Sequence, residues 1–173
     1  MGLKLPEEME KEYHLVCGKI LSLNLTLEGT LNFFLSNYFA YPQDHKTFVL
    51  GDFFVESTFR DRIALFKEIS KREISFYNNV IFNEKETKEI TKLMNEVREM
   101  RNRIAHHQSI YDLKTETITL NNGKSITKEQ DNIPMNEELV KSIERKVKIA
   151  TEAIIELHNK INQKRQKQQK SLE

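Results

Sequence analysis

Apolar residues in the first forty positions recur at the spacing of an α-helix. Between Pro6 and about Tyr41 they follow one another at intervals of three and four, as Val16, Ile20, Leu23, Leu27, Leu31, Phe34, Leu35 and Tyr38. Such intervals place side chains on one face of a helix. Residues 21–27 also alternate between leucine and polar residues, as a strand would, but the helical spacing continues well beyond them. The pattern predicts one long helix.

Three later segments show the same periodicity. Ser57 is the predicted N-cap of a second helix, whose apolar face covers positions 59–69. The segment 83–86 has the spacing of a capping box, and it opens a third helix that continues to the histidines at 106 and 107. Pro134 and Asn136 precede a last helix, with apolar residues at helical spacing from 139 to 161.

Two segments break this helical pattern. Residues 42–56 are expected to form a connector that is apolar enough to pack against the helices. Residues 116–127 contain two β-branched runs around Asn122-Gly123, a strong signal for a β-hairpin. The sequence therefore predicts a mainly α fold, an up-down bundle of four to five helices with a hairpin inserted before the last long helix. We expect one domain over 1–162 and a basic, polar tail over 163–173, whose final Ser-Leu-Glu is typical of a cloning scar.

The composition narrows the class of protein. The 173 residues suffice for one domain with a hydrophobic core. Lys and Arg (27) nearly balance Asp and Glu (26), so a nucleic-acid site would have to be a local patch. The single cysteine, Cys17, lies in an apolar run, where we expect a buried thiol in a reducing compartment. With no N-terminal signal, and an uncharged stretch at 29–43 that is too short to span a bilayer, we expect a cytoplasmic protein without a membrane segment.

The segment RNRIAHH at 101–107 concentrates unusual chemistry at the end of the third helix. On a helical wheel with Ile90 at zero, Arg101 falls at about 20°, inside the apolar arc. Asn102 and His106 lie one turn apart on one flank. A guanidinium that faces a core must be paired, or must face a gap between subunits. Glu28, within the first helix, is the expected partner of a buried ion pair with Arg101, and a subunit interface is the alternative.

These residue types match the needs of RNA cleavage without a metal ion. Arginine supplies a fixed cation, asparagine an amide, and histidine a group that titrates near neutrality. A base can take the proton of the 2′-hydroxyl, a cation can stabilise charge on the phosphate, and an acid can protonate the leaving oxygen. Adjacent histidines on a helix point about 100° apart, and no cysteine or acid supplies ligand spacing, so we expect neither a metal nor a cofactor.

The segment Arg101-Asn102-Arg103-Ile104-Ala105-His106 resembles the signature of the HEPN superfamily, in which an arginine, usually followed by a polar residue, precedes a histidine by four to six positions. The resemblance covers about seven residues in sequence and most of the chain in helix order. It implies a metal-independent endoribonuclease of toxin–antitoxin, abortive-infection or other antiphage systems. It also implies a homodimer with the site in the dimer cleft, an RNA substrate, and an antitoxin or sensor protein as partner.

Carried over to this chain, the resemblance makes Arg101 and His106 the catalytic pair and gives Asn102 an orienting role. Its supporting residues would be Glu28, Arg98 and His107, and His107 also satisfies the spacing of the catalytic histidine. Gln108 stands where related toxins often carry a tyrosine, which argues against regulation by modification of that tyrosine.

Two further alternatives remain open. Arg103, Lys71 and Arg72 are candidates for electrostatic contact with RNA, although charged residues of this kind also occur on ordinary solvated helix faces. A non-catalytic HEPN-like module that binds RNA, nucleotide or a partner protein through the same surface is the alternative function.

Overall fold

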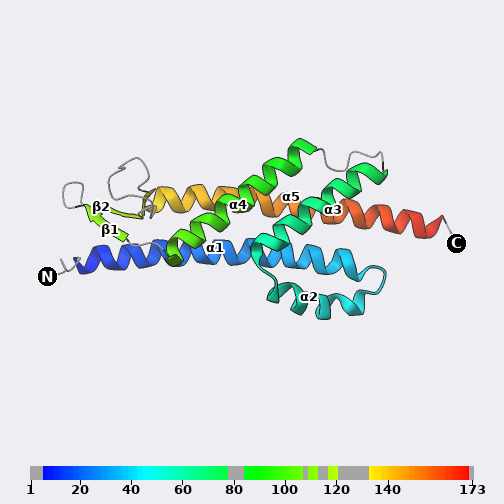
Figure 1. Ribbon diagram of the computed structural model, residues 1–173, viewed down its shortest axis with the longest axis horizontal. Coiled ribbons are helices and arrows are strands. Elements are labelled where there is room, and N and C mark those ends of the chain that lie inside the picture. The colour runs from blue at the N-terminus through cyan, green and yellow to red at the C-terminus, as the bar shows by residue number, and fades with distance from the viewer. Residues whose placement is uncertain (1–5, 78–83, 107–108, 113–116, 121–132, 172–173) are drawn as a thin grey trace.

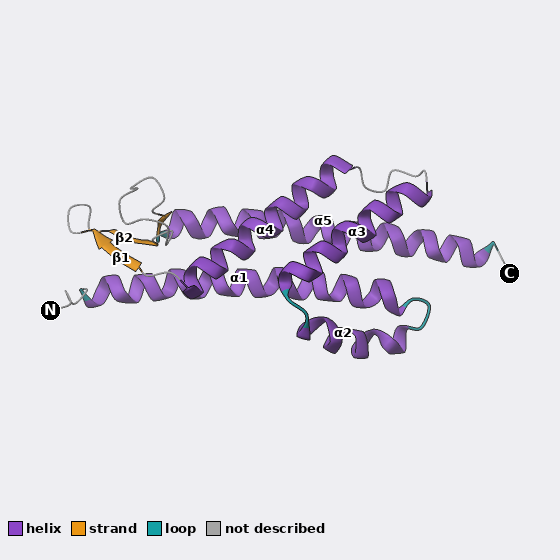
Figure 2. Cartoon of the chain, viewed as in Figure 1, coloured by secondary structure: helices purple, strands orange, loops and turns teal. Residues whose placement is uncertain are grey.

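The computed structural model describes residues 6–77, 84–106, 109–112, 117–120 and 133–171. Figure 2 shows that helices make up most of this part of the chain, which confirms the predicted mainly α class. The elements are, in order, α1 (Glu7–Ala40), η1 (Asp44–Lys46), α2 (Thr47–Glu56), α3 (Phe59–Tyr77), α4 (Glu84–His106), β1 (Ser109–Asp112), β2 (Thr117–Leu120), β3 (Ile133–Pro134) and α5 (Glu137–Lys170).

The two longest helices, α1 and α5, lie side by side and run in the same direction (Figure 1). At the first turn of α5, Glu137 Oε2 lies 2.9 Å from Nζ of Lys19, in the fourth turn of α1. Near their far ends, Arg165 Nη2 donates to the carbonyl oxygen of Tyr38 at 3.2 Å. The short helix α2 turns back after α1, and α3 and α4 then form an antiparallel pair that crosses α1 and α5 obliquely. Direction therefore alternates from each α-helix to the next, from α1 to α5.

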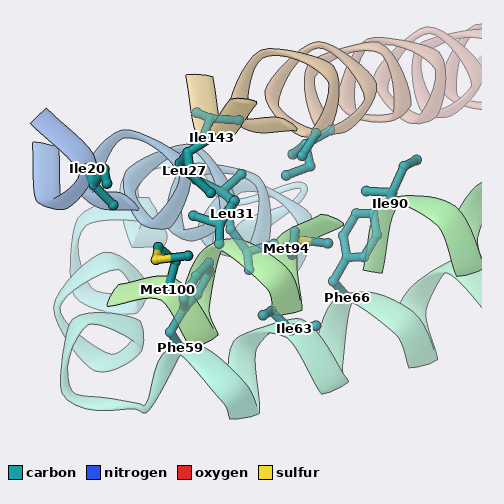
Figure 3. Close-up of a cluster of buried hydrophobic side chains, with 14 of the residues drawn as sticks. Ile20, Leu27, Leu31, Phe59, Ile63, Phe66, Ile90, Met94, Met100 and Ile143 are labelled. Atoms are coloured by element: carbon teal, nitrogen blue, oxygen red, sulfur yellow. The ribbon is translucent and has the colours of Figure 1, made fainter. Parts of the chain in front are cut away.

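The hydrophobic core lies where these helices cross. Figure 3 shows side chains of all four long helices converging there, including Leu27 and Leu31 from α1, Phe66 from α3, Met94 from α4 and Ile143 from α5. Each is at most 2% exposed, and full burial of such a side chain is worth about 1.5–3 kcal/mol. The helical spacing read from the sequence thus identified the buried faces, and Cys17, 9% exposed, is buried as expected.

Local caps fix where two of the helices begin. The side chain of Asn136 accepts a hydrogen bond from Leu139 N at 3.0 Å, which confirms the predicted start of the last helix. At the start of α3, Thr58 Oγ1 accepts from Asp61 N at 3.2 Å. Thr58 therefore caps α3, and the prediction of Ser57 was one residue early. The N–H of Ser57 instead closes α2, by donating to Phe54 O at 3.2 Å.

The prediction of a connector at 42–56 is wrong for residues 44–56, which form η1 and α2. Apolar residues occupy nearly every side of α2, so no helical stripe is visible in its sequence. Phe54 alone is buried in this helix, while Phe48 and Phe53 are 84% and 66% exposed. The amide of Asn32 ties α2 to α1 by donating to Gly51 O at 3.3 Å.

The small sheet differs from the predicted hairpin. Its central strand, β2, contains the first β-branched run, as expected, and is antiparallel to β1, with Ser109 opposite Leu120. The other edge of β2 pairs with β3, where Leu120 lies opposite Ile133. The Asn-Gly turn and the second run at 125–127 lie outside the described residues. Strand β1 was missed, because its signal is just two β-forming residues, Ile110 and Tyr111, a few positions after the histidines.

Two further findings concern membrane-spanning segments and the predicted C-terminal tail. None of the helices in the described ranges combines the length and the apolar character that crossing a bilayer requires. Residues 163–170, assigned from the sequence to a tail, continue α5, and Lys164 and Arg165 are half-buried there.

Candidate functional site

The predicted site occupies the last turns of α4. Met100 is 8% exposed and lies beside Phe59 of α3 in Figure 3, and Ile104 packs against the core one turn later. These two contacts anchor the end of the helix. Arg101 and His106 are exposed to solvent. Asn102, which directly follows Arg101 in the sequence, is half-buried.

The side chain of Arg101 is exposed to solvent, and its guanidinium is hydrogen-bonded to the adjacent residue, Asn102. Arg101 Nη1 donates to Asn102 Oδ1 at 3.2 Å. The expected buried ion pair between Arg101 and Glu28 is therefore wrong. The Cα of Arg101 is at the apolar angle of the helix, but a long arginine side chain can extend past neighbouring apolar groups and keep its charge hydrated.

Glu28 pairs instead with Arg62 of α3. Arg62 Nη2 lies 2.6 Å from Glu28 Oε2, and the two side chains are 7% and 19% exposed. Asn24 Nδ2 donates to the other carboxylate oxygen at 2.5 Å. The sequence did carry a signal for this pair, because Arg62 lies three residues after Phe59 and four before Phe66, on the apolar face of α3.

The geometry of α4 separates Arg101 from His106. The helix is continuous to His106, so five residues correspond to about 140° around its axis. Asn102 and His106, four residues apart, lie within about 40° of each other. Arg98 is half-buried, with Nη2 3.7 Å from Glu99 Oε1, and His107 lies outside the described residues.

The candidate RNA-binding residues fall into two groups. Arg103 is half-buried in the same turn of α4 as the site. Lys71 and Arg72 lie on α3, 12 and 13 residues after Phe59, which adjoins the end of α4. At 1.5 Å per residue this places them about 20 Å along the bundle from Arg101. The structure does not bring them to the predicted site.

Lys71 also has a local partner. Its Nζ lies 2.8 Å from Glu68 Oε1, and this hydrogen bond, with the lysine charge, lowers the pKa of the Glu68 carboxyl.

A large cavity of about 620 Å³ lies between α4 and α5, away from the last turn of α4. Its floor is apolar, with Ile90, Leu93 and Ile149. Its rim carries four glutamates and two lysines, Glu86, Glu89, Glu96, Glu156, Lys92 and Lys160. A rim with excess negative charge repels a phosphate backbone, so this cavity does not suit RNA.

No protein-family model matches the chain, and no curated protein or solved structure matches it either. The HEPN resemblance therefore rests on residues 101–107 and on the order of the helices. Within the described ranges, no three His, Cys, Asp or Glu side chains gather in a way that could hold a metal ion.

Proposed function

We propose that this protein is a metal-independent endoribonuclease that acts as a homodimer, in the role of a toxin or antiphage effector. One observation carries the proposal. The last turns of α4 present a cation and an imidazole to solvent, with an amide between them, and the Arg101 guanidinium is hydrogen-bonded to that amide at 3.2 Å. An amide partner leaves the positive charge of Arg101 unneutralised, so it can stabilise a phosphate.

The reaction follows from these groups. His106 takes the proton of a ribose 2′-hydroxyl, and the 2′-oxygen attacks the adjacent phosphorus. Arg101 stabilises the negative charge that builds on the non-bridging oxygens. The bond from phosphorus to the 5′-oxygen breaks, and a protonated imidazole gives that oxygen its proton. The products are a 2′,3′-cyclic phosphate and a 5′-hydroxyl.

The dimer is part of the proposal because of the angle between the two catalytic side chains. About 140° around one helix directs Arg101 and His106 to different sides of α4. A second copy that brings its own α4 to the same cleft supplies a cation opposite the imidazole, and a second imidazole as the general acid. Arg103, in the same turn, would add positive charge toward the RNA backbone.

The same angle favours the alternative function if the protein is a monomer. A single copy would then present a basic, amide-bearing helix end without convergent catalytic groups. That surface could bind RNA, a nucleotide or a protein partner such as an antitoxin without catalysis.

The experiment combines cleavage with oligomeric state. Purified protein is incubated with single-stranded RNAs of varied sequence in EDTA, and the ends are examined for 2′,3′-cyclic phosphate. We expect cleavage by the wild type and loss of cleavage in His106→Ala and Arg101→Ala. Both side chains are exposed, so stability should change little. Lys88→Ala is the control, because it removes an exposed cation from the other end of α4.

Three results would count against the proposal. Absence of cleavage by the wild type on every RNA would refute the nuclease. Cleavage that survives both substitutions would place the site elsewhere. A monomer by light scattering that still cleaves RNA would refute the requirement for two copies.

A further inference from the structure

We propose that a cavity between the ends of α1, α3 and α5 binds a phosphate monoester carried on a small molecule. The cavity has a volume of about 330 Å³ and lies at the far end of α1 from the first turns of the bundle. Three cationic side chains line it, Arg72 from α3 and Lys164 and Arg165 from α5. The proposal is independent of the proposed ribonuclease, because it shares no residue with the end of α4.

The guanidinium of Arg165 is fixed in place by α1. Its Cζ lies 4.6 Å from the ring centroid of Tyr38 and 4.5 Å from that of Tyr41. Cation–π contacts of this kind hold the planar group against both rings. Nη2 donates to Tyr38 O at 3.2 Å, whereas Nη1 is shielded from solvent and has no hydrogen-bond partner among the described residues. Arg165 therefore keeps an N–H group for a further acceptor.

One carboxylate faces the three cations. Glu73 is 8% exposed, and its Oε1 accepts a hydrogen bond from Tyr38 Oη at 2.7 Å. Nζ of Lys164 is also shielded from solvent. The charged residues that line the cavity are three cations, Arg72, Lys164 and Arg165, and one carboxylate, Glu73, which gives a net charge of +2. A net positive charge in a partly enclosed site attracts an anionic ligand.

The pKa shifts show that the charged groups around the cavity act on one another. Burial lowers the pKa of the Lys164 ammonium, and the Glu73 carboxylate counteracts that shift. Burial and the hydrogen bond to Glu73 raise the pKa of Tyr38 to about 12, although the charges of Arg165 and Arg72 oppose the rise. The charges of Glu73, Arg72 and Arg165 thus all act on the hydroxyl of Tyr38.

The charge and size of the cavity identify the ligand class. A phosphate monoester carries about −1.5 to −2 charges at pH 7, close to the opposite of the cavity's net charge. Ligand sites measure about 300–1,000 Å³, so 330 Å³ suits a phosphate with a small attached group rather than a long chain. The ring of Phe39, 46% exposed, lines the same cavity and offers a face on which such a group can stack.

The test is calorimetric titration of the full chain at fixed ionic strength, with inorganic phosphate, AMP and adenosine as probes. We expect saturable binding of phosphate and AMP and none of adenosine. Arg165→Gln should weaken AMP at least about tenfold, the usual effect of losing a hydrogen bond to a charged group. Lys148→Gln, which removes an exposed charge elsewhere on α5, is the matched control and should bind like the wild type.

Glu73→Gln distinguishes binding from a purely structural role, because it raises the net charge of the cavity. AMP affinity should rise about fourfold or more, the effect of one unit charge roughly 5 Å away in a water-like dielectric. Should Arg165→Gln fail to fold, Arg72→Gln replaces it, since that side chain is exposed. Three outcomes would overturn the proposal: no saturable binding of phosphate or AMP, equal binding by the Arg variants, or binding of RNA alone.

Discussion

The ion pair between Glu28 and Arg62 should be a strong single contributor to stability, and its strength can be measured. Arg62→Met keeps the length and apolar part of the side chain but leaves the carboxylate of Glu28 without its cation. Removing one partner of a buried pair costs about 3–5 kcal/mol. Glu28 remains 19% exposed and keeps its hydrogen bond from Asn24, so we expect the lower end, about 3 kcal/mol. For a chain of this size that corresponds to a fall of roughly 6–12 °C in Tm.

A double-mutant cycle separates the pair from the loss of packing. Glu28→Gln, Arg62→Met and the double variant are unfolded in urea, and the free energies are extrapolated to water. The double variant leaves no isolated charge, so its cost should be less than the sum of the single costs by about 2 kcal/mol.

The exposed pair of Glu84 and Lys88 provides the control, because its atoms are similarly close, 2.8 Å apart, but its side chains are 73% and 68% exposed. We expect no measurable coupling there, since solvent screens the attraction. A coupling between Glu28 and Arg62 as small as that of the control pair would refute the reasoning. Arg101→Met should leave stability unchanged, and a loss comparable to that of Arg62→Met would restore Arg101 as the partner of Glu28.

Three further predictions concern the core, a helix cap and a histidine. Leu27→Ala should cost about 2–5 kcal/mol in urea unfolding, because Leu27 is 0% exposed, whereas Leu25→Ala, at a 67% exposed site, should cost far less; equal losses would contradict the assigned core. Asn136→Ala should cost about 1 kcal/mol by removing the cap of α5, and an unchanged urea midpoint would show that the cap does not matter. Burial and, to a lesser extent, Arg165 lower the pKa of His158, so the unfolded chain takes up its proton first as the pH falls. The wild type should therefore lose stability below about pH 6.5, the ordinary histidine pKa, and His158→Gln should lose less; parallel pH profiles would contradict this assignment.

Helical periodicity predicted the long helices well, because a helix that is buried on one face has apolar residues at intervals of three and four. It failed for α2, where Phe48 and Phe53 remain exposed and the apolar residues carry no stripe. It also failed for β1, a strand of four residues in which just Ile110 and Tyr111 favour β structure, too short a signal to read from sequence.

At the candidate site, the sequence predicted the local helix but not the contacts between helices. The sequence located the end of α4 and the neighbouring Asn102, but the partner of Glu28 depended on which helix lies against α1. Both arginines sit on the apolar side of their helices, and on that criterion Arg101 and Arg62 are equivalent. The start of α3 brings Arg62 to Glu28, and this tertiary placement decided between them.

The parallel contact between the first and last helices has a consequence for how the chain is made. Lys19 and its partner Glu137 are 118 residues apart. At about 5–20 residues per second, a ribosome needs roughly 6–24 s between synthesis of the two. Throughout that interval the apolar face of α1 has no α5 to cover it. In the nascent chain, α3 and α4 or a chaperone must therefore cover Leu27 and its neighbours until the last helix has been synthesised.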